Sequence, residues 1–356
     1  MKRYLFLLLL SALFLQSCNL LPDAVADAIT GATKTMATDG NSLFHQTKEV
    51  SLKTGTLTVE GEVKTPGEIN LDNHYKQEVF IKESLYDAES GINFIGAYRY
   101  RGYSLFDLLH PFNHEKKNAE VFRPAIDLYV VIENATGERV SFSWSEIFHT
   151  NNPHQIIIAT EAAPIVPYRK EVNYETGDTW KVVAANDLFA YRVLVDPVKI
   201  TVYSFDKKEY VINRDLEPLY SQEIQVMQDD QQIASIPMIE DEDAYTRYYS
   251  SFYGMGMGYH AARYFQGPLL SKLLEGSIDF FDPELNRHGL VCFAGLDGYR
   301  SVYSYSELFN RTDQVMHILA VPENPMDGGF YRIFHPSEFY ADRSVKSLAE
   351  IYFFSH

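Results

Sequence analysis

The sequence contains one segment twice, and this repeat constrains the fold more than any other feature. Residues 136–148 read TGERVSFSWSEIF and residues 297–309 read DGYRSVYSYSELF. A glycine, an arginine, two serines, a glutamate and a phenylalanine coincide without a gap. Self-similarity at long range predicts that one structural unit is built twice. A chain of 356 residues is also long enough for two domains.

The N-terminus resembles a bacterial lipoprotein signal. Lys2 and Arg3 precede an apolar run, residues 5–15, that is too short to span a bilayer comfortably, and Cys18 follows shortly after it. In this pattern the cysteine is acylated and becomes the mature N-terminus, and two or more acyl chains give stable anchoring. The alternative is an ordinary signal peptide with a chance cysteine. We expect a signal peptide at 1–17, lipidation of Cys18 and a polar tether over 18–50.

The charge and the anchor limit the partners. The formal net charge is −17, and removal of residues 1–17, whose only charged residues are Lys2 and Arg3, changes it to −19. This balance argues against nucleic acid, whose phosphates would be repelled. The sequence has no second long apolar run, and Asn19 rather than Asp follows the cysteine. We expect an extracytoplasmic protein held on the outer membrane by its lipid, with an unidentified ligand or envelope protein as partner.

Local patterns predict short strands and short helices in the same order in both halves. Each half has a glycine followed by a helix, then a hairpin with turn residues, then a Ser-x-x-Glu capping box that opens another helix. Ser104 is placed to cap the first of these helices, and Pro268 suits the first position of its counterpart. We expect a first domain at 51–205, a connecting segment at 206–245 that holds a strand near 223–227, and a second domain at 246–356.

This order of elements resembles the molybdopterin-binding domain of sulfite-oxidase-like oxidoreductases. The most similar stretch is the last, in which YRIFHP at 331–336 precedes RSVKSL at 343–348, and LTVEGEVKTP at 57–66 is similar to that domain's first strand and turn. The resemblance implies an α+β fold: two tandem sulfite-oxidase-like molybdopterin-binding-type units, strand-rich with short helices. It also implies that Arg332, Arg343 and Lys346 match positions that hold the pterin phosphate. Ordinary surface charge is the alternative. Arg192 is a poorer match in the first copy.

The resemblance breaks down at the metal ligand. Members of that family bind molybdenum through a cysteine, because the metal needs a soft thiolate, and the corresponding stretches here, 79–100 and 248–265, contain none. Cys292 lies elsewhere, on a strand, where we expect a small buried apolar side chain. Molybdopterin is therefore a cofactor only by resemblance. We assign no catalytic residue and no metal ligand.

A glycine-rich loop is the best candidate for a pocket. Residues 253–260 read YGMGMGYH, and alternating glycines allow a ligand to approach the backbone closely. A plain hairpin or flexible loop is the alternative. The candidate residues are the loop positions Gly254, Gly256, Gly258, Tyr259 and His260, together with the nearby Arg263.

Three functions follow as hypotheses. The leading one is a non-catalytic derivative that binds a ligand or an envelope partner. The second is a molybdopterin-dependent oxidoreductase with a ligand other than cysteine, and the third is a structural lipoprotein of an envelope complex.

Overall fold

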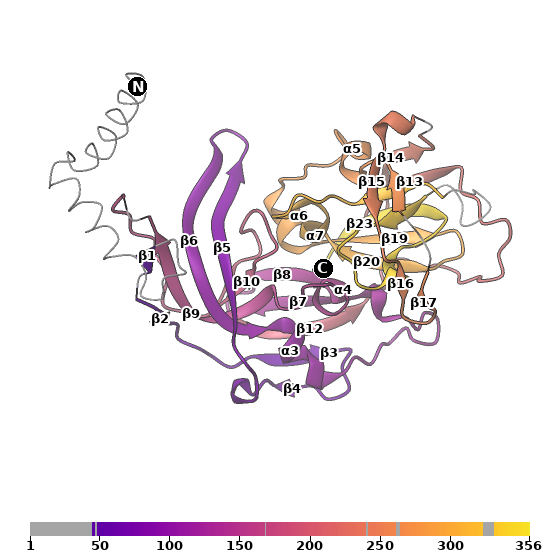
Figure 1. The fold of residues 1–356 in the computed structure, drawn as a ribbon. Helices are drawn as coiled ribbons and strands as arrows, with labels where there is room; N and C mark the ends of the chain where they lie inside the picture. Colours follow the sequence, from indigo (N-terminus) through magenta and orange to yellow (C-terminus); the bar gives the residue numbers. More distant parts are fainter. Residues whose placement is uncertain (1–44, 47, 168, 240, 261–263, 323–330) are drawn as a thin grey trace, which may run out of the picture.

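The computed structural model describes residues 45–46, 48–167, 169–239, 241–260, 264–322 and 331–356. The architecture is strand-rich with a few short helices, an α+β fold (Figure 1). No helix within these ranges is long and apolar enough to cross a membrane.

The largest sheet is antiparallel and has seven strands. Its alternation is clearest in the longest strand, where Tyr98 and Tyr100 are buried while Arg99 and Arg101 point to the other face. Two of its strands form the long hairpin that projects from the body in Figure 1. In sheet order the strands are β11 (Leu194–Val195), β10 (Lys181–Ala184), β9 (Ile156–Val166), β6 (Gly91–Ser104) and β5 (Gln77–Asp87), with β1 (His45–Gln46) and β2 (Val50–Ser51) also paired to β9.

Two five-stranded sheets have the same strand order and the same directions. In each, the second strand runs parallel to the third, and all other neighbours are antiparallel. The first contains β4 (Gly67–Glu68), β3 (Thr58–Gly61), β12 (Pro197–Ser204), β7 (Leu128–Asn134) and β8 (Arg139–Ser143). The second contains β14 (Gln231–Pro237), β13 (Glu223–Gln228), β23 (Leu348–Ser355), β19 (Gly289–Gly295) and β20 (Arg300–Ser304).

The repeated segment forms the same local structure in both places. Gly137 and Gly298 have φ angles of +87° and +75° in the hairpin turns, a conformation that other residues rarely adopt. Ser143 and Ser304 then cap helices α4 (Trp144–Phe148) and α7 (Tyr305–Phe309), each with a complete capping box. Both predicted capping boxes are thus confirmed.

A glycine is required before each predicted helix, because in both halves a neighbouring strand leaves no room for a side chain. A Cβ on Gly102 would lie 2.0 Å from the carbonyl oxygen of Ile158, and one on Gly267 would lie 2.0 Å from that of Leu319. The helices that follow are α3 (Leu105–Leu109), capped by Ser104 as predicted, and α5 (Leu270–Leu273). Pro268 lies before the N-cap residue of α5, so its predicted place in the first turn was wrong.

Short two-stranded sheets and helix α6 also belong to the described part of the second half. The strand predicted near 223–227 is β13, so the segment 206–245 holds two strands of the second five-stranded sheet. The remaining elements are β15 (Thr246–Tyr249) paired with β18 (Tyr264–Gly267), β16 (Tyr253–Gly254) with β17 (Gly258–Tyr259), β21 (Ile318–Ala320) with β22 (Arg332–Phe334), and helix α6 (Pro283–His288).

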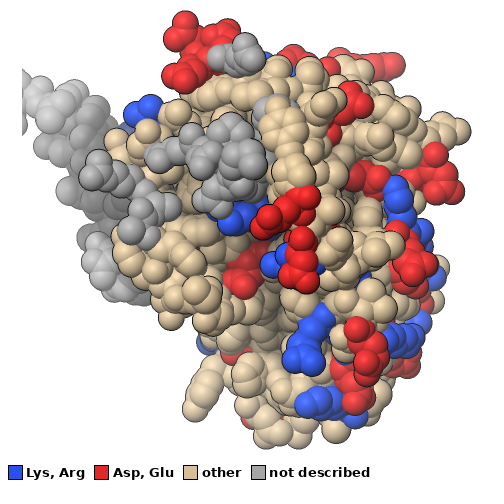
Figure 2. All heavy atoms as spheres, turned by 90° about the vertical axis from the view of Figure 1, so that its right-hand side faces the viewer, with Lys and Arg blue, Asp and Glu red and all other residues tan. Residues whose placement is uncertain are grey.

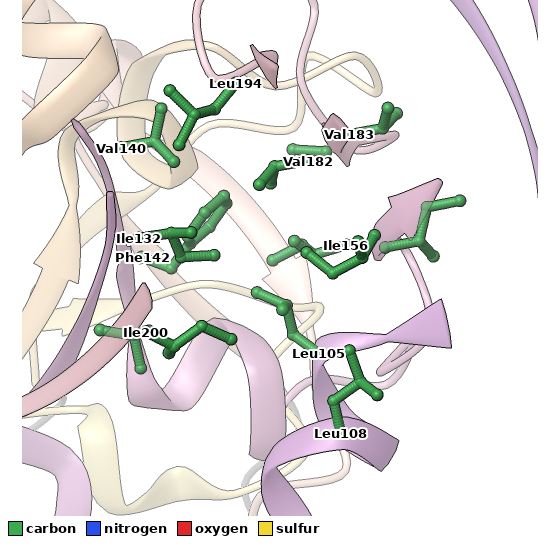
Figure 3. Packing of buried hydrophobic residues seen from close by; sticks show 14 of the residues in the cluster. Leu105, Leu108, Ile132, Val140, Phe142, Ile156, Val182, Val183, Leu194 and Ile200 are labelled. Carbon is green, nitrogen blue, oxygen red and sulfur yellow. The ribbon is translucent and has the colours of Figure 1, made fainter. Parts of the chain in front are cut away.

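Each half has its own apolar core, and a third cluster joins the two five-stranded sheets. In the first half, side chains from helix α3, from the seven-stranded sheet and from the first five-stranded sheet pack together (Figure 3). The joining cluster contains Tyr129 and Val131 from β7 and Cys292, Tyr352 and Phe354 from β19 and β23. Full burial of such a side chain contributes about 1.5–3 kcal/mol, so this cluster contributes substantially to holding the halves together.

Candidate functional site

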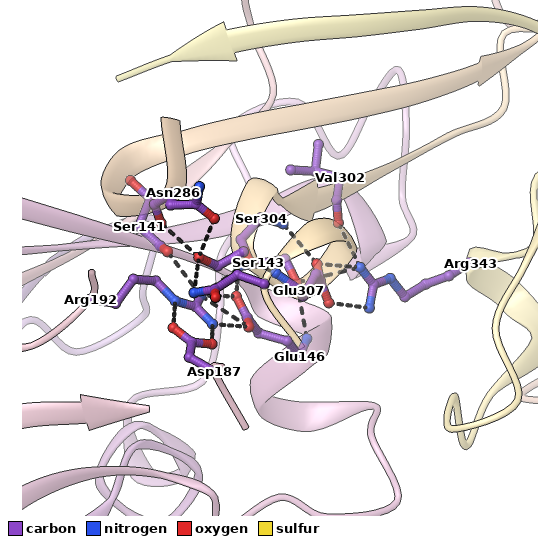
Figure 4. A network of polar contacts seen from close by, with 12 residues as sticks. Ser141, Ser143, Glu146, Asp187, Arg192, Asn286, Val302, Ser304, Glu307 and Arg343 are labelled. Carbon is purple, nitrogen blue, oxygen red and sulfur yellow. Dashed lines mark hydrogen bonds and ion pairs between the residues drawn. The ribbon is translucent and has the colours of Figure 1, made fainter. Parts of the chain in front are cut away.

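A buried network of charged side chains lies where the two halves meet (Figure 4). Arg192 is 1% exposed and makes ion pairs with Glu146, at 3.0 Å, and with Asp187, at 2.6 Å. Its guanidinium also packs 4.3 Å from the ring centroid of Phe142 and donates a hydrogen bond to the carbonyl of Ser141. Its partner Glu146 is the capping-box glutamate of helix α4, so one carboxylate both caps a helix and pairs with an arginine.

Arg343 repeats this arrangement in the second half. It is also 1% exposed, and its ion pairs are to Glu307, the capping-box glutamate of α7, at 2.7 Å and to Glu338 at 2.9 Å. Its guanidinium lies 3.6 Å from the ring centroid of Tyr303 and donates to the carbonyl of Val302. The two arginines therefore have the same set of partners at corresponding positions.

Each half also contributes to the other half's network. Arg192 donates to the hydroxyl of Ser304 at 3.1 Å, and Arg343 reaches that of Ser143 at 3.4 Å. The backbone N–H of Leu188 donates to the backbone carbonyl of Asn310 at 2.7 Å, and the backbone N–H of Phe339 donates to the backbone carbonyl of His149 at 3.0 Å. The residue after Asp187 thus binds the C-terminal end of helix α7, and the residue after Glu338 binds the C-terminal end of helix α4.

The network holds more acids than arginines, and burial shifts their titration. Desolvation raises the pKa of Glu146 to about 7, although the nearby Arg192 opposes the shift. Desolvation likewise raises the pKa of Glu338 to about 7 against the effect of Arg343, and it raises the pKa of Asp187. Part of the excess negative charge is therefore removed by protonation near neutral pH.

A pocket of about 420 Å³ lies beside this network. The hairpin β16–β17 and the segment 333–344 form its walls, and Asn151 reaches it from the first half. Eight of its seventeen lining residues are Phe or Tyr, and none is Lys or Arg. The lining residues are Asn151, Tyr249, Ser250, Ser251, Phe252, Tyr253, Tyr259, Tyr303, Ile333, Phe334, His335, Pro336, Glu338, Phe339, Tyr340, Ala341 and Ser344. We call this the aromatic pocket.

Several rings of the aromatic pocket are accessible to solvent. Tyr249, Tyr253, Tyr259 and Phe339 are 78%, 44%, 65% and 48% exposed. The ring centroids of Phe339 and Tyr340 are 4.8 Å apart and nearly perpendicular, and that of Tyr253 lies 6.1 Å and 6.3 Å from them. Exposed aromatic rings gathered around a concavity of this volume are typical of a binding site for a small molecule.

The candidate basic residues do not come together in this pocket. Arg343 already has two carboxylate partners, so a phosphate could bind it only by displacing them. Arg332, on β22, lies 5.2 Å and 5.6 Å from the ring centroids of Phe252 and Phe265. Lys346 is exposed shortly before β23, and Arg263 lies outside the described residues. Basic and acidic side chains are interspersed on the face drawn in Figure 2, with no separate basic patch.

The glycine-rich loop is the hairpin at the rim of the aromatic pocket. Tyr259 and Tyr253 line the pocket from paired positions. Gly254, Gly256, Gly258 and His260 do not line it. A Cβ on Gly254 would lie 3.6 Å from the Nε2 atom of His260, and nothing lies within 4 Å of one on Gly256. Gly258 has a φ of +74°, which the tight turn requires.

The residues that the structure describes do not fit a molybdenum pterin. Cys292 is fully buried in β19, and burial raises the pKa of its thiol well above the ordinary value, so no thiolate is available for a soft metal. Among the described residues that line the aromatic pocket, none offers a cationic side chain for a phosphate. Among the described residues no group of three or more His, Cys, Asp or Glu could hold a metal ion. Cys18 lies outside the described residues.

Sequence reasoning missed two parts of this site. An acid precedes each buried arginine by five residues, at Asp187 and Glu338, and this shared spacing is the signal in the sequence. In the pocket wall at 333–344 only Arg343 was predicted to bind, as a phosphate ligand, and only the fold places this wall against a hairpin that lies far away in the sequence.

The comparisons with known proteins do not identify a family. No protein-family model matches the chain, and no curated protein matches it. Among solved structures, the chain is similar to the crystal structure of the sulfane dehydrogenase SoxCD from Paracoccus pantotrophus, with 11% sequence identity and a TM-score of 0.28. The match covers 85% of this chain and 79% of that one. A TM-score of this size does not establish a shared fold.

Proposed function

We propose that this protein is a non-catalytic, membrane-anchored binding protein that holds its ligand in the aromatic pocket. The observation that carries the proposal is the combination of a 420 Å³ cavity with solvent-exposed rings at its rim. Large apolar side chains exposed together are costly for a soluble surface unless a ligand or partner covers them.

Two tandem units of one fold are the second part of the proposal. The equal order and direction of the two five-stranded sheets, the matching capping boxes and the matching pairs of arginine and acids all support it. The order of sequence elements described above is what relates this unit to sulfite-oxidase-like molybdopterin-binding domains.

Loss of oxidoreductase chemistry is the third part. The thiol of Cys292 is inaccessible, and Arg343 is held by Glu307 and Glu338. Protein expressed with an intact molybdopterin pathway should contain no stoichiometric molybdenum by elemental analysis. Stoichiometric metal would instead favour the oxidoreductase with an unconventional ligand.

The anchor is tested separately from the ligand. We propose that Cys18 is acylated and holds the protein on the outer membrane, as the signal sequence suggests. A Cys18→Ser variant should lose incorporation of labelled fatty acid and should leave the membrane fraction. Retention of the label would show that the acylated residue is another one.

The test of ligand binding is a thermal-shift screen of wild type and a Phe339→Ala variant against small molecules of diverse charge. At least one compound should raise the melting temperature of wild type and have little effect on the variant, since binding to the native state stabilises it. Tyr75→Ala is the matched control, because Tyr75 is 87% exposed and lies outside the pocket. If no compound distinguishes wild type from Phe339→Ala, the structural envelope lipoprotein becomes the better account.

A further inference from the structure

The lining of the aromatic pocket selects a class of ligand, and this inference rests on the proposed function. We propose that the pocket binds an organic cation, a molecule that carries a substituted ammonium group. A cation placed over the face of a tyrosine or phenylalanine is attracted to the ring's electron density, and the attraction grows when water is excluded.

The arrangement of the rings suits such a group. The planes of Phe339 and Tyr340 meet at 81°, and the ring of Tyr253 is inclined to them at 55° and 43°. Rings in several orientations around one cavity can present faces to different sides of a compact, roughly spherical group. A flat sugar or nucleobase would instead favour rings with parallel faces.

The charge of the lining residues also favours a cationic ligand. Glu338 is the one ionisable acid among the lining residues, and its Oε2 atom has no hydrogen-bond partner. Arg343 pairs with the other oxygen of this carboxyl group, and Glu307 shares the charge of that arginine. A buried acceptor without a partner costs free energy, and a nearby cation would offset that cost.

The pocket disfavours anions for the same reasons. None of the lining residues in the described part of the chain is Lys or Arg, and His335 is kept neutral because burial lowers the pKa of its imidazole to about 3. The Nε2 and Nδ1 atoms of His335 are occupied by the carbonyl of Val315 and by Ser337. An anion in the pocket would therefore meet aromatic faces and a carboxyl group without a compensating positive charge.

The test compares choline with 3,3-dimethylbutan-1-ol, an uncharged molecule of the same shape, by calorimetric titration of the whole protein. We expect choline to bind at least about tenfold more tightly than the alcohol, because only the cation is attracted to the ring faces and the attraction grows when water is excluded. Phe339→Ala and Tyr253→Ala should each weaken choline binding several-fold. Tyr253→Phe, which keeps the ring, and Tyr75→Ala should not.

Glu338→Gln separates the charge from the shape of the pocket. This variant should weaken choline binding and leave the weak binding of the alcohol unchanged. Equal affinities for the two molecules, or no choline binding up to about 50 mM, would overturn the inference. A neutral compound that binds wild type and not Phe339→Ala would retain the proposed function while rejecting the cation.

Discussion

At the scale of single residues, several charged side chains are buried and stabilise the fold. Arg192 and Arg343 are among the largest fully buried side chains, and each joins a helix-capping glutamate to a second acid. A buried charge without its partner is strongly unfavourable, so these groups depend on one another.

The first prediction concerns Arg343. Arg343→Ala should lower the free energy of unfolding by about 3–5 kcal/mol, because Glu307 and Glu338 would remain buried without their cation. Arg214→Ala is the matched control, since the side chain of Arg214 is 61% exposed and its pair with Asp297 should be worth at most about 1 kcal/mol. Urea denaturation of both variants measures the difference. Equal, small losses would contradict a structural role for the network.

The second prediction concerns the pH dependence contributed by Glu338. Its pKa is raised from 4.5 to about 7 on folding, so the folded state binds more protons than the unfolded state between these values. This group therefore stabilises the fold least at high pH, and its contribution falls as pH rises from about 4.5 to 7. Buried His149 and His335, whose pKa values are lowered to about 3, act in the opposite direction below pH 6.5.

Because these effects oppose each other, the measured quantity is the difference between Glu338→Gln and wild type. The variant should gain stability relative to wild type as pH rises from about 4.5 to 7, by at most about 1.4 kcal/mol per pH unit. Glu120→Gln, at an exposed position, controls for the loss of one acidic charge. A difference that does not change with pH would show that Glu338 titrates normally in the folded state.

At the scale of elements, the sequence predicted those features that depend on a few neighbouring residues. Capping boxes, turn glycines and the Ser104 cap depend on a few neighbouring residues, and the structure has them where the sequence placed them. Strand β6 was not predicted although Tyr98 and Tyr100 alternate with Arg99 and Arg101, because Gly102 suggested a loop before the helix. The partners of Arg343 could not be foreseen, since Glu307 and Ser143 reach it only through the fold.

The third prediction tests the two corresponding glycines. Gly102→Ala and Gly267→Ala should each destabilise the protein by about 1–3 kcal/mol or more, because the new methyl group would overlap a backbone carbonyl that cannot move freely. Gly67→Ala should be nearly neutral, since nothing lies within 4 Å of its added carbon. The melting temperatures of the three variants test this prediction. An unchanged melting temperature for Gly267→Ala would contradict the proposed equivalence of the two positions.

At the scale of the whole molecule, the two halves are interlocked. The cluster around Tyr129 and Cys292 and the reciprocal bonds of Arg192 and Arg343 join them through apolar and charged contacts at once. The repeat in the sequence did not predict that each half would contribute a serine hydroxyl to the other half's charged network.

The fourth prediction follows from this interlocking. Trp144 and Trp180 are the only tryptophans in the sequence and both lie in the first half, so their fluorescence reports that half alone. Circular dichroism reports the strands of both. We expect the two signals to give coincident unfolding transitions in urea, because neither half can separate without exposing the shared cluster. Two resolved transitions would mean that the halves fold independently.

Hydrogen–deuterium exchange tests most directly whether a ligand occupies the aromatic pocket. The compound with the largest effect in the thermal-shift screen should slow exchange in peptides that cover 249–259 and 333–344, and it should do so in wild type but not in Phe339→Ala. Slowed exchange confined to other segments, or an identical response in the variant, would contradict binding in the aromatic pocket.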